Sequence, residues 1–272
     1  IFFRLTMEPR TISHVVTIFS SIACALVALS CLLRRVPDAS QSLWLPGPNN
    51  ASKRATEIWF LAYSVVWIGA FAGIVGTKAY ESFDKMHYAI VCGGLALPYL
   101  LQPLVAPGIT QDAGKPLLER YSLKANVWVF IFGFIGNYWY THYFYNVLKA
   151  EYTMPGWDLN GVPIGMFFGT HFYFCFYHVL SNCVIRKIST TYEASWTRTL
   201  FTTSVILAMS YTTAFMETLT ISAFPCWQFK DTHMVYTIGS AFYAIYFIVS
   251  FPMFYRVDED PKGPRFSLFT TA

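Results

Sequence analysis

Charge is the scarcest feature of this sequence. Only 12% of the 272 residues are charged, whereas 55% are hydrophobic and 19% are aromatic. Soluble domains carry about 25% charged residues, so this composition excludes an ordinary soluble domain and predicts a membrane protein. The net charge of +4 comes without a basic tract, which argues against nucleic acid as a partner.

Paired cysteines and metal-ligand motifs are also missing. The six cysteines include no C-x-x-C pair and lie mostly inside apolar runs, which is typical of small buried side chains rather than of disulfides or zinc ligands. Three histidines (His142, His171 and His178) and Glu217 could still be interpreted as metal ligands. No H-x-x-H or H-x-x-E spacing places two of them on adjacent turns of one helix. The sequence therefore predicts no metal site.

Long apolar runs are what the sequence does contain. Seven of them reach the length of about 20 residues that a helix needs to cross a hydrocarbon core of about 30 Å. They cover residues 11–33, 55–77, 87–107, 126–148, 162–185, 199–222 and 234–255. Together they hold two acidic residues, Glu57 and Glu217, and no Lys or Arg. Since the first run could instead be a signal anchor, the predicted fold is an all-α, polytopic transmembrane helix bundle with six or seven spans.

The basic residues predict the orientation of these spans. Thirteen of the 19 Lys and Arg residues fall in loops 34–54, 108–125 and 186–198 and in the tail from residue 256. The positive-inside rule places these segments in the cytosol. Glu217 and His142 then lie about 8 and 9 Å inside the lumenal ends of their helices, and His171 lies about 14 Å inside. The three side chains are expected to share the lumenal half of one cavity.

Polar side chains recur at helical spacing in the last three runs, so each set occupies one helix face. The sets are His171, Cys175, His178 and Asn182; Thr213, Glu217 and Thr220; and Tyr236, Ser240, Tyr243 and Ser250. Polar faces on otherwise lipid-like helices predict an enclosed pocket. The alternative is interhelical hydrogen bonding that only holds the bundle together, at about 0.6 kcal/mol for each bond.

Glu217 is the side chain that most needs an explanation. An ionised carboxylate at membrane depth is costly, so Glu217 is expected to retain a proton that it can donate. The alternative is a structural pair with a histidine. His142 lies in the uncharged run 126–148, among aromatic side chains and close to Asn137, which makes that run a second wall of the expected pocket.

Six stretches of the sequence resemble one family of enzymes. They are SLWLPGPNNASKRATE from Ser42, RYSLKANVW from Arg120, GNYWYTHYFYNVLKAEYTMPGW from Gly136, THFYFCFYHVLSN from Thr170, METLTISAFP from Met216 and FYAIYFIVSFPMFYRVDE from Phe242. In this order they resemble the cycloeucalenol cycloisomerases, over roughly residues 42–259.

The resemblance implies opening of the 9β,19-cyclopropane ring of cycloeucalenol to give obtusifoliol, in the endoplasmic reticulum membrane and without a cofactor. For this reaction C19 must be protonated by a water-shielded acid, and a proton must then leave C8. Positive charge develops near C9 in between, where aromatic faces can stabilise it. The expected partners are the cyclopropyl sterol and membrane lipid, and the oligomeric state is left open.

The residues suggest a division of roles, which is a hypothesis of its own. Glu217 is the expected acid, and His142 or His178 is its partner or the base. The expected substrate-binding residues are Trp139 and Tyr140 as cation-stabilising walls, Asn137 and Asn182 as groups that orient the acid, the base or the 3-hydroxyl, and Tyr143, His171 and Tyr243. For each aromatic side chain the alternative is a packing or lipid-facing surface.

Residues 42–259 are expected to form the membrane-embedded sterol isomerase domain. An N-terminal extension, residues 1–40, has one apolar span and no counterpart in the family. Residues 260–272 are expected to be a short cytosolic tail, where the family continues with a further hydrophobic segment. The alternative function is a non-catalytic sterol or lipid carrier or receptor that keeps the pocket without the chemistry.

Overall fold

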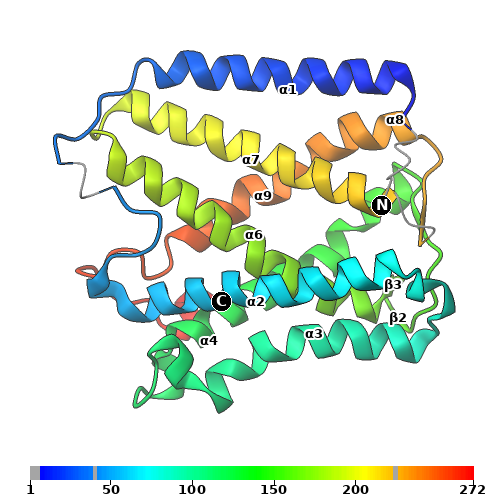
Figure 1. Cartoon of the computed structure of the whole chain (residues 1–272), viewed down its shortest axis with the longest axis horizontal. Coiled ribbons are helices and arrows are strands. Elements are labelled where there is room, and N and C mark those ends of the chain that lie inside the picture. The colour runs from blue at the N-terminus through cyan, green and yellow to red at the C-terminus, as the bar shows by residue number, and fades with distance from the viewer. Residues whose placement is uncertain (1–6, 39–41, 223–225) are drawn as a thin grey trace. The chain divides into compact units, whose positions relative to one another are not determined.

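The computed structural model describes residues 7–38, 42–222 and 226–272 (Figure 1). Residues 1–6 and 39–40 of the expected extension, and the Ala-Phe-Pro end of the METLTISAFP stretch, lie outside these residues. Within them the secondary structure is almost entirely helical, and the strands are two-residue pieces. The predicted helical fold class is therefore confirmed.

Each of the seven predicted apolar runs overlaps a helix of 15 residues or more. These are α1 (Pro9–Ser30), α2 (Ala51–Gly76), α3 (Lys85–Val105), α4 (Tyr121–Ile135), α6 (Ile164–Thr191), α7 (Trp196–Ser222) and α9 (Ser240–Tyr255). The short helices are α5 (His142–Asn146), α8 (Thr232–Met234) and α10 (Leu268–Thr271), with π-helices η6 (Gly136–Tyr140) and η7 (Val235–Gly239). The 3-10 turns are η2 (Pro48–Asn50), η3 (Ala79–Ser82), η4 (Pro107–Thr110) and η5 (Leu117–Glu119). The strands are β1 (Glu151–Tyr152), β2 (Asp158–Leu159), β3 (Val162–Pro163) and β4 (Trp227–Gln228), paired antiparallel as β1–β4 and β2–β3.

Five of the described helical segments are long and apolar enough to cross a membrane, which makes the chain a multi-pass membrane protein. They are Pro9–Ser30, Pro48–Gly76, Lys85–Val105, Trp196–Thr220 and Thr232–Tyr255. Helix α4 has only 15 residues, and α6 carries the polar face of His171, His178 and Asn182. The exact count of six or seven spans stays a prediction.

The helices pack into two compact units. Unit 1 consists of Ile1–Trp44, His142–Thr153 and Ser181–Pro252. Unit 2 consists of Leu45–Thr141, Met154–Leu180 and Met253–Ala272. Helix α6 runs through Leu180 from one unit into the other. The domain boundaries expected from the sequence stay a prediction.

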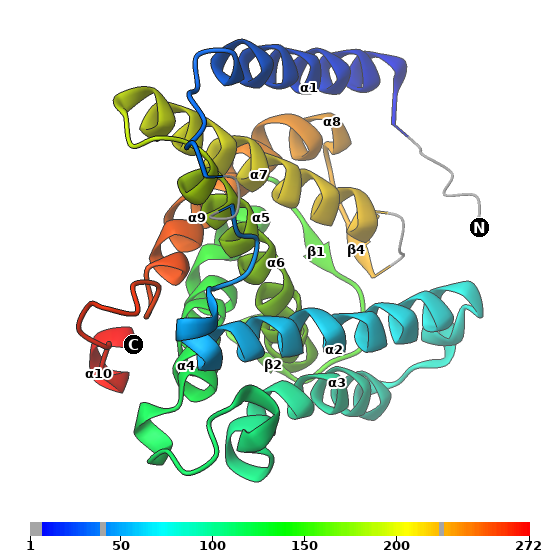
Figure 2. The ribbon, with the colours of Figure 1, turned by 60° about the vertical axis from the view of Figure 1, so that its left-hand side comes forward.

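In unit 1, helix α1 packs along α7 and η7 (Figures 1 and 2). Phe19 of α1 contacts the rings of Tyr211 and Phe215 of α7, at centroid distances of 5.6 and 5.2 Å. After α1 the chain forms a bridge to Tyr192, and Val36 N donates to Thr191 O at 3.0 Å. These contacts make α1 part of the packing of unit 1.

In unit 2, helices α2, α3 and α4 pack on one another, with Phe60, Tyr63 and Tyr99 in the core. Figure 2 shows α2 and α3 side by side. Gly133 of α4 faces α6, where an added Cβ would lie 3.2 Å from Thr170 Cγ2. A small residue lets two helices approach closely in a membrane protein, so Gly133 brings the polar face of α6 against α4.

Unit 2 also contains a buried ionic network. Lys124, which is 3% exposed, pairs with Asp258 at 2.9 Å, and the fully buried Lys53 pairs with Glu259 at 2.9 Å. Asp112 is fully buried and accepts hydrogen bonds from Ser52, Lys115 and Ser122. Because charges are costly to bury, their pairing fixes how the first turns of α2 and α4 meet the segments after α3 and after α9 within the unit.

The predicted helix over residues 126–148 stays helical as far as Asn146, but a π-helical turn interrupts the regular α-helix. At η6 the backbone hydrogen bonds change from the α-helical to the π-helical pattern. Thr141 N donates to Gly136 O, five residues back, at 3.0 Å. The extra residue rotates the following side chains by about 100° relative to a regular helix. Helix α5 then ends at Asn146, and Lys149, with φ of 52°, reverses the chain toward β1.

Candidate active site

The carboxyl group of Glu217 is held by a tyrosine. Glu217 lies on α7, and its Oε2 accepts a hydrogen bond of 3.1 Å from Tyr243 Oη of α9. Both residues belong to unit 1 and are half-buried. The bond joins two of the polar faces expected from helical spacing. On the α9 face, Tyr236, Ser240 and Ser250 are buried, whereas Thr220 on the α7 face is exposed and bonds only to backbone carbonyls.

A second tyrosine, Tyr152, interacts with Glu217 from β1. The β1–β4 pair sets Tyr152 opposite Trp227, and Thr153 N donates to Cys226 O at 3.0 Å, so the strand is fixed close to the end of α7. The Tyr152 and Tyr145 side chains share a hydrogen bond. Burial raises the pKa of the Tyr152 phenol well above its usual value, and the charges of Tyr145 and Glu217 raise it further. Tyr152 is therefore a neutral hydrogen-bond donor at any physiological pH.

His142 adjoins the same group of tyrosines. Its ring meets that of Tyr145 edge-on, with centroids 5.4 Å apart and planes at 88°. His142 Nε2 is buried and has no hydrogen-bond partner among the residues that the structure describes. Glu217, Tyr152, Tyr145 and His142 thus form a connected series within unit 1, which we call the Glu217 cluster together with Tyr243. In this series Tyr145 and Tyr152 lie between His142 and Glu217, and the predicted partnership of the two residues stays a prediction.

Aromatic side chains enclose this cluster. Phe144 contacts the Tyr243 ring edge-on at 5.4 Å, and Phe247 contacts it at 5.1 Å. Tyr143, an expected substrate-binding residue, stacks on Phe242 at 3.6 Å. Gly239 of η7 would place an added Cβ 2.8 Å from Leu148 Cδ1, so its lack of a side chain lets the α5–β1 segment approach η7. The Glu217 cluster is therefore a carboxyl group surrounded by phenol and phenyl rings.

His178, the other expected base, lies in unit 2 and is fully buried. Its Nδ1 bonds with Phe174 O at 2.8 Å, so Nδ1 carries the hydrogen and Nε2 holds the lone pair of the neutral ring. The rings of Trp128, Phe174 and Phe254 surround it at 5.2, 5.4 and 5.4 Å. Asn182, one turn further along α6, is also fully buried.

His171 of α6 is bonded to a residue that the sequence analysis missed. Its Nε2 lies 3.0 Å from Asn126 Oδ1 of α4, and Cys175 Sγ lies 3.8 Å from the same nitrogen. His171, Cys175, His178 and Asn182 are all buried, so the predicted polar face of α6 does point into protein.

The remaining predicted site residues, which lie in η6, differ in how far they are buried. Asn137 is buried, and its amide donates to Gly133 O and Thr170 Oγ1, both at 2.9 Å. These bonds tie η6 to α6 and use both amide hydrogens. Tyr140 is half-buried. Trp139 is 61% exposed and packs edge-on against Tyr138, which makes it the least suited of the predicted aromatic residues to an enclosed wall.

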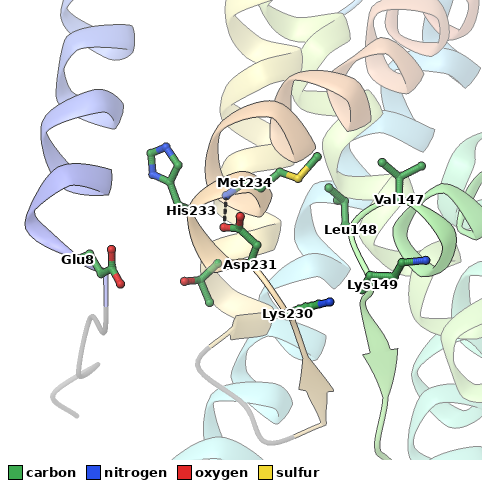
Figure 3. Close-up of a pocket in the computed structure, with 9 residues that line it drawn as sticks. Glu8, Val147, Leu148, Lys149, Lys230, Asp231, His233 and Met234 are labelled. Carbon is green, nitrogen blue, oxygen red and sulfur yellow. Dashed lines mark hydrogen bonds between the residues drawn. The ribbon is translucent and has the colours of Figure 1, made fainter.

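Unit 1 also has a cavity of about 520 Å³ at the start of α1 and α8 (Figure 3). Glu8, Lys149, Lys230, Asp231 and His233 line it, and Asp231 caps the helix by accepting from Met234 N at 2.9 Å. Ligand pockets for apolar molecules are lined mainly by hydrophobic side chains. The charged lining of this cavity does not suit a sterol skeleton.

Sequence reasoning missed Tyr145, Tyr152 and Asn126. Tyr145 lies three residues after His142, a spacing that marks neighbours on a helix, so this signal was present. Asn126 begins the run that carries His142, and only the packing of α4 on α6 shows its partner. Tyr152 follows the reversal at Lys149, and no periodicity in the sequence places it beside α7.

A known relative matches most of the sequence. The cycloeucalenol cycloisomerase of Arabidopsis thaliana is 43% identical over 225 residues, which are 82% of this chain and 79% of the relative. No protein-family model and no solved structure matches the chain.

Proposed function

The chain belongs to the cycloeucalenol cycloisomerase family, and we propose that it opens the 9β,19-cyclopropane ring of a 4α-methyl sterol, converting cycloeucalenol into obtusifoliol. The relative of known function supports the reaction, since it is an enzyme of this name and shares most of the chain. The single structural observation that supports the mechanism is the Glu217–Tyr243 hydrogen bond inside a group of tyrosines.

The reaction is an isomerisation and consumes no redox equivalent. A proton adds to C19 as the C9–C19 bond breaks, so C19 becomes a methyl group and C9 becomes electron-deficient. The C8–H bond then breaks, its electron pair forms the C8–C9 double bond, and the proton leaves to a base. One proton enters and one leaves, so the protein must only hold and return it.

Glu217 is the proton donor in this proposal. Tyr243 donates to Oε2 of the carboxyl group, which leaves Oε1 to carry the proton that is transferred. A cyclopropane is a weak base, so the acid has to be oriented and shielded from water before it can protonate carbon. The hydrogen bond from Tyr243 orients the acid and stabilises the carboxylate that forms when the proton leaves.

The rings of Tyr243, Tyr152 and Phe144 stabilise the charge that develops near C9. Aromatic faces attract cations, and the attraction is stronger in a site without water, where it amounts to about 2 kcal/mol or more. Such rings are also compatible with a hydrocarbon ligand, which charged side chains are not. The Glu217 cluster thus supplies an acid and a cation-stabilising surface from the same few residues.

His142 is the base that we favour over His178. It lies in unit 1 with Glu217, and Tyr145 and Tyr152 connect the two. Its buried Nε2 has no partner among the described residues and is suited to take the C8 proton. The proton then returns to Glu217 through the tyrosine hydroxyls, which completes the cycle.

The substrate reaches this site from a membrane, which we propose is that of the endoplasmic reticulum. Five apolar helical segments support a membrane location. A sterol dissolved in lipid has direct access to a protein whose helices lie in the same bilayer, and its low solubility in water makes any other route slow.

The direct test is product formation by the full chain. Yeast microsomes that contain the chain are supplied with cycloeucalenol, and their sterols are analysed by gas chromatography and mass spectrometry. Obtusifoliol is expected, and in D₂O the product should carry one deuterium at C19, because the carboxyl proton exchanges between turnovers. Microsomes from the same strain without the chain are the control. Cycloeucalenol that is bound but unchanged would overturn the proposal and favour a carrier.

A further inference from the structure

Unit 2 has a cavity of about 850 Å³ beside the N-terminal end of α2. Its lining comes from three parts of the chain, within residues 49–52, 111–124 and 258–269. Helix α10, in the last of these parts, packs on α4 (Figure 2). The Glu217 cluster belongs to unit 1, so the proposed reaction does not use this cavity. Sites for whole small ligands measure about 300–1,000 Å³, so the cavity is large enough to hold a molecule of its own.

Arg265 lines this cavity and has no carboxylate partner among the residues that the structure describes. Its Nη1 bonds at 3.3 Å to Asn50 Oδ1 and to the backbone oxygen of Asp258, which are both neutral acceptors. Its Nε and Nη2 form no hydrogen bond within the described parts of the chain. A guanidinium group matches the geometry of a phosphate, to which it donates two parallel hydrogen bonds. Arg265 is therefore suited to bind a phosphate group.

Glu119, on η5, is an exposed carboxylate of the same cavity, and it has no cation partner in the chain as far as the structure describes it. The other charged groups of the lining are already paired. Lys124 pairs with Asp258, and Lys115 pairs with the buried Asp112, each at 2.9 Å. The cavity thus offers one cation and one anion to a ligand. A complementary ligand carries one negative and one positive group.

The cavity also has an apolar part that reaches the surface. Leu118 and Phe269 line it and are 60% and 93% exposed. The membrane-spanning segment that contains α2 begins at Pro48, so the cavity beside this end lies at the level of the lipid headgroups. A small soluble ion gains nothing from such side chains. A phospholipid presents a charged headgroup and hydrocarbon chains together at this level of the bilayer.

We propose that this cavity binds one phospholipid whose headgroup carries a phosphate and a primary ammonium group, as phosphatidylethanolamine does. Arg265 binds the phosphate, and Glu119 accepts hydrogen bonds from the ammonium group. Leu118 and Phe269 contact the acyl chains. The quaternary ammonium of phosphatidylcholine has no hydrogen to donate to Glu119, so the site prefers the primary amine.

The test measures lipid binding to the full chain, purified in detergent, by native mass spectrometry. The chain is titrated with phosphatidylethanolamine and with phosphatidylcholine of identical acyl chains. One phosphatidylethanolamine should bind to each chain, about 10-fold more tightly than phosphatidylcholine, because a hydrogen bond to a charged group is lost with choline. Equal affinities would overturn the inference. The measurement uses no sterol, so its result does not depend on the proposed reaction.

A soluble competitor distinguishes a lipid from a free phosphate ester. Glycerophosphoethanolamine has the same headgroup without acyl chains. At the concentration of the lipid it should not displace bound phosphatidylethanolamine, because it lacks the contacts with Leu118 and Phe269. Displacement at equal concentration would overturn the assignment to a lipid and favour a soluble phosphate ester.

Two variants assign the headgroup contacts. Arg265→Gln should weaken the binding of both lipids at least about 10-fold, because both carry the phosphate. Glu119→Gln should weaken only phosphatidylethanolamine and so abolish the preference. Lys262→Gln and Glu81→Gln make the same charge changes at exposed residues outside the lining and should keep the wild-type affinities. A preference that survives in Glu119→Gln, or unchanged affinities in Arg265→Gln, would overturn the inference.

The variant Phe269→Ser tests the acyl-chain contact. Its side chain is 93% exposed, so the substitution should leave the thermal unfolding of the chain without added lipid unchanged. Lipid affinity should fall about 10-fold, because less apolar surface is covered on binding. Ile109→Ser, at an exposed residue of η4 outside the lining, is the control and should bind as the wild type does. Unchanged affinity in Phe269→Ser would overturn the placement of the acyl chains against α10.

Discussion

Two regions of the molecule hold buried or half-buried carboxyl groups, and these groups have different kinds of partner. In unit 2, Asp258 and Glu259 are paired with the ammonium groups of Lys124 and Lys53. In unit 1, the partner of the Glu217 carboxyl group is the phenol of Tyr243. In the cation-paired region, each charge offsets part of the cost of burying the other. The phenol-bonded region offers a hydrogen bond without a compensating positive charge.

The difference indicates where chemistry can occur. A carboxylate beside a buried lysine is bound to a fixed cation, which makes it a structural group. A carboxyl group among tyrosines can give up a proton and receive it back, and the rings beside it tolerate a hydrocarbon ligand. The sequence shows acidic residues in both regions, and their partners distinguish the structural pairs from the proposed proton donor.

The largest effect is expected at the phenol-bonded carboxyl group. Glu217→Gln keeps the shape and the hydrogen bond with Tyr243 but removes the transferable proton. General acids contribute about 10²–10⁴-fold to rate, so obtusifoliol formation should fall at least about 10³-fold, with little change in the thermal unfolding of the detergent-solubilised protein. Glu193→Gln, an exposed site between α6 and α7, is the control. Undiminished turnover in Glu217→Gln would remove this residue from the mechanism.

A substitution that breaks an ion pair in the cation-paired region should lower the free energy of unfolding. Lys124→Met leaves Asp258 buried without its cation, and breaking a buried pair in this way costs about 3–5 kcal/mol. Chemical unfolding of the purified protein in detergent measures the loss. The double variant Lys124→Met/Asp258→Leu removes both charges and should recover most of it. A single variant as stable as the wild type would show that the pair is not structural.

A smaller effect is expected from the phenol itself. Tyr243→Phe keeps the ring beside the carboxyl group and removes the hydrogen bond, which is worth about 1.5–3 kcal/mol when one partner becomes charged. The rate of ring opening should therefore fall about 10–100-fold, while Glu217 still supplies the proton. Tyr192→Phe, at a half-buried tyrosine whose ring packs on Phe201, should leave the rate unchanged. An unaltered rate in Tyr243→Phe would show that the phenol does not support the acid.

The smallest effect concerns pH and the ionic network of unit 2. Burial alone would raise the pKa of Asp112, but hydrogen bonds from Ser52, Lys115 and Ser122 outweigh it, so the pKa lies below its usual value. A depressed carboxyl pKa stabilises the folded chain above the unfolded pKa of about 3.9, and this contribution is lost as pH falls through the folded value. Asp112→Asn should therefore cost about 2 kcal/mol near pH 7 and progressively less below pH of about 4.

Thermal unfolding of both proteins in detergent between neutral and acid pH measures this difference. The melting temperatures of the wild type and Asp112→Asn should approach each other as the pH falls. A difference that stays constant with pH would show that the carboxylate charge is not what stabilises this part of unit 2.

Local pattern predicted much of the fold, because lipid imposes simple demands on a sequence. Each of the seven apolar runs contains a helix, since a chain without charges or water must satisfy its backbone internally. The polar face of α6 followed from its spacing and is buried. The regular α-helical register expected over residues 126–148 is lost after Gly136, because a π-turn adds a residue to the helix and no local sequence pattern predicts it.

Composition and spacing by themselves determined that this chain is a helical membrane protein with one conspicuous carboxyl group in its sixth apolar run. Only the tertiary structure determined which residues contact that carboxyl group. Tyr243 comes from α9, and Tyr145 and Tyr152 come from a segment that the π-turn, Lys149 and the β1–β4 pair redirect. The reason is physical: helix formation depends on neighbours along the chain, whereas the partners of a buried acid depend on contacts between segments far apart in the sequence.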